Sequence, residues 1–336
     1  MEKLERIRGS LLAGAAGDAL GYQVEFKSLD YILQQHGDRG VRTMAPRISD
    51  DTQMTLFTAE GMLMGIKHHM PMPACVYQSY LDWYKTQQRY ARGGAFAAES
   101  ELLQVEGLYL WEAPGNTCLS ALGSGKIGLM DDPINRSKGC GGVMRAAPCG
   151  MLKMPDLPDN EDAYALQGAM AGAITHSHIM GYVPAAMLAD LVHLILLEDG
   201  RTLEEIVLDS LARMERMFAY PATQAFAELI RRAVALAKTD LPETECIRQL
   251  GAGWVGDEAI AIAVYCVLRH PDDMAECLSA AVTHDGDSDS TGAIAGNILG
   301  AWLGAEAIPA EWLNAIELRD VVDGMARKLY EAAEKL

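Results

Sequence analysis

Apolar residues recur along this chain at the three- and four-residue spacing of an amphipathic helix. The pattern predicts helices over residues 4–12, 204–218, 257–268 and 274–282. Alternating apolar and polar residues, which would indicate strands, do not persist over any useful length. The sequence therefore predicts an all-α fold. Because no low-complexity linker or fixed-period repeat interrupts it, we expect one compact multi-helix domain over residues 1–336.

Three of the predicted helices are unusually rich in small residues, at 9–21, 165–173 and 292–305. Glycine inside a helix costs about 1 kcal/mol relative to alanine. Such a cost is tolerated where helix backbones pack closely or where the backbone approaches a ligand. The sequence leaves both explanations open, and they are compatible.

Composition and charge narrow the function classes. The chain has 28 basic and 46 acidic residues, a formal net charge of −18, and no dense basic cluster, so direct nucleic-acid binding is not expected. The seven cysteines form no C-x-x-C pair, so neither a disulfide framework nor a thiolate zinc site is indicated. No uninterrupted apolar run approaches 18 residues, and the first residues do not resemble a signal peptide. We therefore expect a cytoplasmic protein that does not enter a membrane.

The first candidate for chemistry is an acidic segment, Ser49-Asp50-Asp51-Thr52-Gln53, just before an apolar-periodic helix over 54–64. Serine and aspartate are good N-caps, and early acids complement the helix dipole. Capping does not require two adjacent carboxylates flanked by hydroxyls, whereas a hard cation such as Mg²⁺ or Mn²⁺ prefers such oxygen ligands. On this segment alone, capping is the simpler explanation.

A second acidic segment near the other end of the chain changes that balance. Asp287, Asp289 and Ser290 precede the small-residue helix over 292–305. The D-x-D start resembles a calcium loop, but the glycine and the distal glutamate of an EF-hand are not at their required positions. Two divalent ions need several bridging carboxylates, so the two acidic helix starts are interpreted as halves of one metal site.

A glycine-rich loop, SKGCGGVMR over residues 137–145, is the third candidate. Its backbone N–H groups are suited to a phosphate, although the spacing is not that of a P-loop and the signal is weak by itself. Cys140 lies between glycines, so a nucleophilic thiol is an alternative, but no base lies near it in the sequence. Trp254 is either a core residue or a pocket wall.

Taken together, these segments resemble the ADP-ribosylglycohydrolase family. The matching segments follow the family's order and read GSLLAGAAGDALGYQVEF, SDDTQMTLFTAEGM, SKGCGGVMRAAP, THSH, GWVGDEAIAIAVYC and HDGDSDSTGAIAGNILGAWLG. The resemblance implies an all-α bundle that holds two Mg²⁺ or Mn²⁺ ions between its acidic segments. It also implies hydrolysis of N- or O-glycosidic bonds of ADP-ribose.

The resemblance carries over to individual positions. It implies that Glu25 lies near the cleft entrance. Two positions depart from the commoner family pattern, because Cys140 stands where many members have asparagine and Ser290 where threonine is commoner. The implied metal ligands are Ser49, Asp50, Asp51, Asp287, Asp289 and Ser290, and the implied ADP-ribose contacts are Gly139, Cys140, Gly141, Gly142 and His176.

The predicted activity is metal-dependent removal of ADP-ribose from a modified protein side chain, with an arginine linkage favoured, or from a related small-molecule adduct. Metal ions would acidify a bound water, Asp287 or Asp289 would act as base, and Glu25 would gate entry. The expected partners are an ADP-ribosylated protein or adduct and a cognate ADP-ribosyltransferase.

Two other functions remain open at the level of sequence. One is an immunity or binding protein of the same fold that blocks an ADP-ribosylating toxin, although structural relatives would be expected to lose the carboxylates. The other is an HD-type metal phosphohydrolase, suggested by His284-Asp285 with His176 and His178 as further ligands. The HD-type interpretation leaves Asp50 and Asp51 unexplained.

Overall fold

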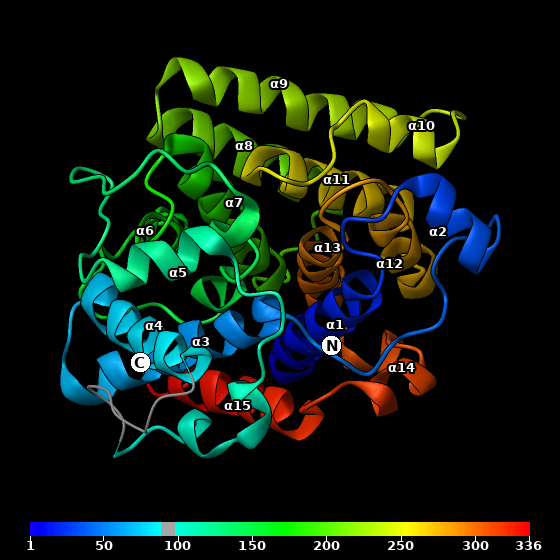
Figure 1. Ribbon diagram of the computed structural model, residues 1–336. Coiled ribbons are helices and arrows are strands. Elements are labelled where there is room, and N and C mark those ends of the chain that lie inside the picture. The colour runs from blue at the N-terminus through cyan, green and yellow to red at the C-terminus, as the bar shows by residue number, and fades with distance from the viewer. Residues whose placement is uncertain (89–97) are drawn as a thin grey trace.

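The computed structural model describes residues 1–88 and 98–336, and this part of the chain is built from helices and loops without a strand (Figure 1). The all-α prediction is confirmed. The α-helices of the described residues are α1 (Lys3–Tyr22), α2 (Leu29–His36), α3 (Asp50–His68), α4 (Met72–Gln87), α5 (Asn116–Gly123), α6 (Ala163–Ala173), α7 (Ile179–Leu196), α8 (Leu203–Met217), α9 (Pro221–Leu236), α10 (Glu243–Arg248), α11 (Gly256–Arg269), α12 (Met274–Val282), α13 (Ser288–Leu303), α14 (Ala310–Ala315) and α15 (Arg319–Ala333). Short 3₁₀ turns lie at η1 (Leu102–Gln104), η2 (Glu106–Tyr109), η3 (Cys140–Gly142), η4 (Ala147–Gly150) and η5 (Ala305–Ala307).

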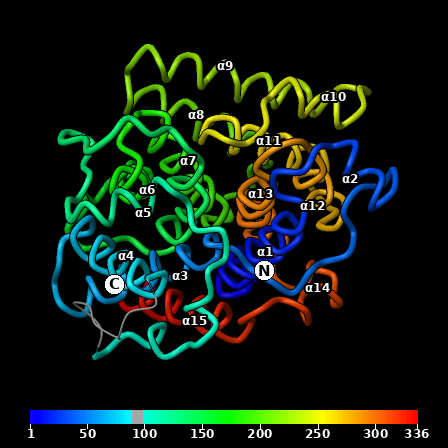
Figure 2. The backbone as a smooth tube through the Cα atoms, in the orientation of Figure 1, coloured from blue at the N-terminus to red at the C-terminus, as the bar shows by residue number. Residues whose placement is uncertain are grey.

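Helices α1 and α13 form the central pair, although one is at the start of the chain and the other near its end (Figure 2). A Cβ atom added at Gly9 would lie 2.2 Å from the carbonyl oxygen of Gly300, and one at Gly17 would lie 2.0 Å from that of Gly292. The helices are therefore antiparallel and in backbone contact. Close packing explains the small residues in both helices.

This antiparallel pairing places the C-terminal end of α1 beside the N-terminal end of α13. A Cβ atom at Gly21 would lie 2.3 Å from the carbonyl oxygen of Ser288. The second acidic segment thus begins next to the loop that follows α1. The close packing predicted for the small-residue helices also brings distant segments to one point.

At both acidic segments, the helix begins a few residues before the first residue of the predicted apolar pattern. The helix predicted over 54–64 is α3, which begins at Asp50, and the small-residue helix predicted over 292–305 is α13, which begins at Ser288. Apolar spacing cannot mark a first turn made of polar residues. Asp50, Asp51 and Asp289 consequently lie inside the first turns of these helices. The unpaired backbone N–H groups there carry a partial positive charge that favours nearby carboxylates.

Helix α7 is long and apolar enough to cross a membrane by length and composition alone. However, 83% of that 18-residue stretch is buried inside the protein. Burial of this kind is typical of the core helix of a globular protein. Helices α8 and α9 cover α7 along one edge of the molecule (Figure 1).

Candidate active site

A cavity of about 410 Å³ opens where the starts of α3 and α13 meet the loop after α1. Both acidic segments and the glycine loop contribute to its wall. Its predicted site residues are Glu25, Asp50, Asp51, Gly139, Cys140, Gly141, His176, Asp287, Asp289 and Ser290, and its further lining is Phe26, Trp111, Ala113, Pro114, Gly115, Asn116, Thr117, Cys118, Met144 and Trp254.

Two predicted site residues lie behind this wall. Ser49 is fully buried as the N-cap of α3, and its hydroxyl accepts a hydrogen bond from the Asp51 backbone N–H at 3.2 Å. A hydroxyl oxygen has a second lone pair, so its assignment as a ligand stays a prediction. Gly142 packs against the backbone of α7, because a Cβ there would lie 2.2 Å from the carbonyl oxygen of Gly181.

The start of α3 is held by a carboxylate to which the sequence assigned no role, that of Asp18 on α1. Asp18 is completely buried and accepts hydrogen bonds from the backbone N–H groups of Ser49, at 3.0 Å, and Thr52, at 3.1 Å. The Thr52 hydroxyl donates to the same carboxylate. Asp18 and the Ser49 cap together satisfy these N–H groups at the start of α3, which leaves the Asp50 and Asp51 side chains available to the cavity.

The two carboxylates of α3 have different environments. Asp50 accepts a hydrogen bond from the Gly115 backbone N–H at 2.9 Å, which fixes its side chain against the loop before α5. Asp51 is 2% exposed, and its Oδ2 atom has no hydrogen-bond partner in the described part of the chain. A buried, ionised carboxylate oxygen without a donor is unfavourable unless a proton or a cation neutralises it.

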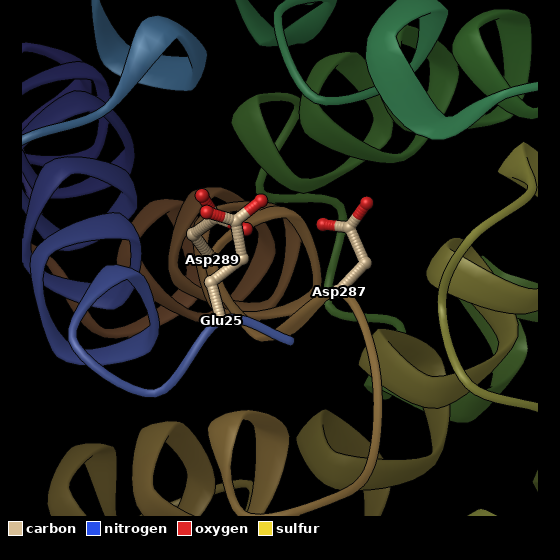
Figure 3. Close-up of side chains that lie close together, drawn as sticks. All are labelled: Glu25, Asp287 and Asp289. Carbon is tan, nitrogen blue, oxygen red and sulfur yellow. The ribbon is translucent and has the colours of Figure 1, made fainter. Parts of the chain in front are cut away.

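The second acidic segment meets Glu25 at the opposite wall. Ligand oxygens of Glu25, Asp287 and Asp289 all lie within 4.8 Å of one another, and the three carboxylates turn toward the same side (Figure 3). The Asp287 backbone N–H donates to the carbonyl oxygen of Ala252 at 2.9 Å, which anchors the start of α13 to the loop before α11. The spacing of these oxygens suits a shared divalent cation.

The electrostatics of the cavity favour a bound cation. Burial, and after it the neighbouring carboxylates, raises the pKa of Glu25 to about 8 and that of Asp50 to about 7. The same causes raise the pKa values of Asp51 and Asp289 well above the ordinary range. Five acids crowd the cavity, and among residues 1–88 and 98–336 no lysine or arginine forms an ion pair with them. Without a cation, protons must neutralise part of this charge.

Cys140 is poorly suited to act as a nucleophile. Its Sγ–H donates to Asp287 Oδ2 at 2.8 Å. Burial and the neighbouring Asp287 carboxylate raise the pKa of the thiol well above its usual range. Since the thiolate is the reactive form, the geometry disfavours covalent catalysis at this residue.

The glycine loop approaches His176 rather than forming an open cradle. A Cβ atom at Gly141 would lie 2.9 Å from His176 Cε1. The Gly139 N–H donates to Ser137 Oγ at 3.4 Å, and the Cys140 N–H donates to the carbonyl oxygen of Trp254 at 3.3 Å. Two of the N–H groups predicted to face a phosphate are therefore engaged within the protein.

Aromatic side chains form the rim of the cavity. Trp254 is a pocket wall and not a core residue, since it is 49% exposed and stacks on Phe26 with ring centroids 5.1 Å apart. Trp111 lines the same cavity and is also exposed. Phe26 and Trp111 could not be assigned to the site from the sequence, because an isolated aromatic residue in a loop carries no periodic signal.

The residues that suggested an HD-type site have structural roles. His284 Nε2 lies 2.8 Å from Thr291 Oγ1, and its Nδ1 lies 2.8 Å from the carbonyl oxygen of Asp285. His178 caps α7 by accepting from the Met180 N–H at 3.0 Å. Both rings have hydrogen-bond partners within the protein and neither lines the cavity, so the structure does not support the HD-type interpretation.

The chain is similar to known proteins over nearly its whole length. The chain is similar to ADP-ribosylhydrolase ARH3 of Danio rerio, 26% identical with 98% of this chain and 90% of that protein covered. It is also similar to ADP-ribosylarginine hydrolase Tri1 of Pseudomonas putida, 23% identical with 100% of this chain and 80% of that protein covered. A solved structure, an ADP-ribosylglycohydrolase-related protein complex, shares the fold with a TM-score of 0.65, 24% identity and 99% of each chain covered. The family profile described as ADP-ribosylglycohydrolase matches residues 1–336, and the chain therefore belongs to the ADP-ribosylglycohydrolase family.

Proposed function

We propose that this protein is a metal-dependent hydrolase that removes ADP-ribose from a modified protein side chain, with residues 1–336 acting as one domain. The observation that carries the proposal is the convergence of Glu25, Asp50, Asp51, Asp287 and Asp289 on one cavity. A protein that only blocks a partner has no need for five clustered carboxylates, four of them buried, whose crowding destabilises the fold. Family membership supports a glycohydrolase activity.

Two divalent cations, Mg²⁺ or Mn²⁺, fit the oxygen-rich wall. The proposed ligands on one side are Ser49, Asp50 and Asp51, and those on the other are Asp287, Asp289 and Ser290. The unpartnered Asp51 Oδ2 and the spacing of Glu25, Asp287 and Asp289 support this assignment. When bound, such ions lower the pKa of a coordinated water and neutralise developing negative charge.

The chain's own residues supply the remaining chemistry. Asp287 or Asp289 is the proposed base toward water, and loss of ADP-ribose from its acceptor passes through an oxocarbenium-like state that nearby carboxylates stabilise. The Cys140 thiol keeps Asp287 oriented through their hydrogen bond. Glu25 follows α1 on the cavity wall and is proposed to control entry.

An arginine linkage is the proposed substrate preference. The guanidinium group of an ADP-ribosylated arginine is cationic, so an acidic cavity in a chain of net charge −18 attracts it more than the neutral O-glycosidic oxygen of a serine linkage. The similarity to an ADP-ribosylarginine hydrolase supports the same choice. The proposed partners are an ADP-ribosylated protein or adduct and the ADP-ribosyltransferase that produces it, in the cytoplasm.

The experiment that tests the proposal measures release of free ADP-ribose from matched peptides modified on arginine or on serine. The protein is assayed with Mg²⁺, with Mn²⁺ and after exhaustive chelation. We expect release from the arginine-linked peptide only when a metal is present. Equal activity after chelation would refute the metal requirement, and turnover of the serine-linked peptide alone would refute the linkage.

A further inference from the structure

Arg145 is a buried cation directly behind the cavity. It is completely inaccessible to solvent, and among the described residues it has no carboxylate ion-pair partner. Its guanidinium donates to Thr175 Oγ1 at 2.5 Å and to the carbonyl oxygen of Ala171 at 3.3 Å, and it lies 4.3 Å from the centre of the Tyr80 ring. Burying an unpaired charge is costly, so a functional reason for its position is expected.

Thr175 links this cation to a residue of the cavity wall. Its Oγ1 atom lies 2.8 Å from Nδ1 of His176, while His176 lines the cavity and is 2% exposed. The guanidinium can only donate, so it occupies a lone pair of the Thr175 oxygen and leaves the hydroxyl proton for another acceptor. The direction of the hydrogen bond between Thr175 and His176 therefore determines the tautomer of His176.

Two arrangements are chemically possible. If His176 carried its proton on Nδ1, both Arg145 and His176 would donate to the Thr175 oxygen, and the hydroxyl proton would turn to the sulfur of Cys118, a weak acceptor. If Nδ1 is unprotonated, the hydrogen bonds run from Arg145 to Thr175 to His176, and the Thr175 hydroxyl donates to a ring nitrogen, which is a better acceptor than sulfur. The fixed positive charge also favours a lone pair, rather than an N–H, on the side of the ring that faces it.

The opposite edge of the ring faces the glycine loop. A Cβ atom at Gly141 would lie 3.2 Å from His176 Nε2, and one at Gly139 would lie 3.4 Å from it. This edge therefore adjoins the space that glycine leaves open for a ligand. Because two N–H groups of the loop are engaged within the protein, a donor on His176 takes over part of their predicted role.

We infer that Arg145 and Thr175 are positioning residues that hold His176 as the Nε2–H tautomer, so that it presents a permanent hydrogen-bond donor to a phosphoryl oxygen of the ligand. The identity of that ligand rests on the proposed function, whereas the tautomer does not. Burial and the nearby Arg145 charge lower the pKa of His176 to about 3, so the ring stays neutral and does not exchange protons with substrate near neutral pH.

The tautomer is measured directly by long-range ¹H–¹⁵N correlation spectra of the whole protein labelled with ¹⁵N-histidine. His176→Asn identifies the signals of His176 among the eight histidines. Nε2 couples to both ring protons and Nδ1 strongly to only one, so the spectrum distinguishes the two nitrogens. We expect a protonated Nε2 and an unprotonated Nδ1 from pH 5 to pH 8. A protonated Nδ1 in the unmodified protein, or a ring that titrates in this range, would overturn the inference without reference to activity.

Variants of Thr175 test the link to Arg145. Thr175→Ser keeps the hydroxyl and should keep the Nε2–H tautomer, whereas Thr175→Val removes it and should give a mixture of tautomers. The affinity for ADP-ribose, measured by calorimetry, should fall about tenfold in Thr175→Val and be retained in Thr175→Ser, as expected for loss of one hydrogen bond. Unchanged tautomer and affinity in Thr175→Val would refute the role of Thr175. If ADP-ribose does not bind even the unmodified protein, the proposed function fails while the tautomer result stands.

Discussion

Replacing one carboxylate of the cavity should stabilise the metal-free protein while it removes the response to metal. We consider Asp289→Asn, because Asp289 lies within 4.8 Å of both Glu25 and Asp287. Two charges at that distance repel by roughly 3 kcal/mol at an effective dielectric constant near 20. Partial protonation relieves some of this repulsion, and loss of a favourable charge at the start of α13 costs about 0.3–1 kcal/mol. We expect a net gain of about 1–2 kcal/mol in the free energy of unfolding.

The pH dependence has a definite sign. Burial and neighbouring carboxylates raise the pKa of Glu25 to about 8, and that of Asp289 is also raised. When folding raises the pKa of a carboxyl group, the protonated group contributes fully to the stability of the folded protein below its unfolded-state pKa. This contribution is lost as the pH rises from the unfolded-state pKa to the folded-state pKa. The advantage of Asp289→Asn in chelator should therefore be largest near pH 8 and small near pH 5.

The assay is thermal unfolding with chelator and with excess Mg²⁺ or Mn²⁺. A metal at a hundredfold excess over its Kd stabilises the unmodified protein by about 2.7 kcal/mol, and Asp289→Asn should lose most of this increase. Asp159→Asn is the matched control, since it removes one charge from a fully exposed side chain. A chelated Asp289→Asn protein that melts below the unmodified protein at pH 8, with a normal metal response, would refute the repulsive-cluster argument.

Three further variants separate the roles within the cavity. Asp50→Ala should abolish turnover with unchanged helical circular dichroism, because a proposed metal ligand is lost. A near-normal kcat would mean that Asp50 serves only as an acidic residue in the first turn of α3. Cys140→Asn should retain most activity, since the thiol is protonated and the asparagine amide can donate to Asp287 in its place, and an inactive but folded and metal-loaded Cys140→Asn would reopen covalent catalysis. Gly141→Val should raise KM several-fold in steady-state kinetics, because its Cβ would lie 2.9 Å from the His176 ring.

Much of the architecture could be predicted from the sequence because it depends on local periodicity. The helix predicted over 274–282 is α12 with the same bounds, and that over 257–268 is α11 within one residue at each end. The two acidic segments were also predicted to meet at one site, from the number of carboxylates that a pair of ions requires. Local spacing is sufficient to predict these helices, since each helix depends on neighbours in the chain.

The residues that the sequence did not reveal act through tertiary contacts. Asp18 lies inside a small-residue helix, where nothing local shows that its carboxylate caps another helix. Arg145 appeared near a phosphate loop in the sequence, but the fold turns it away from the cavity toward Thr175 and Tyr80. A side chain's direction and its partners depend on elements far along the chain, which a single sequence does not place.

The small-residue helices connect the local sequence pattern with the tertiary contacts of the site. Gly17 contacts the backbone of Gly292, and the next residue after Gly17 is the aspartate that holds the start of α3. Any side chain at Gly17 would push α13 away from α1, and Asp289 would move with α13 relative to Asp18 and the α3 carboxylates. Glycine lowers the helix propensity at these positions, but it allows the close approach of α1 and α13 that sets the distance between the two halves of the acidic cavity. In this fold, the packing of α1 on α13 and the geometry of the proposed metal site are one constraint.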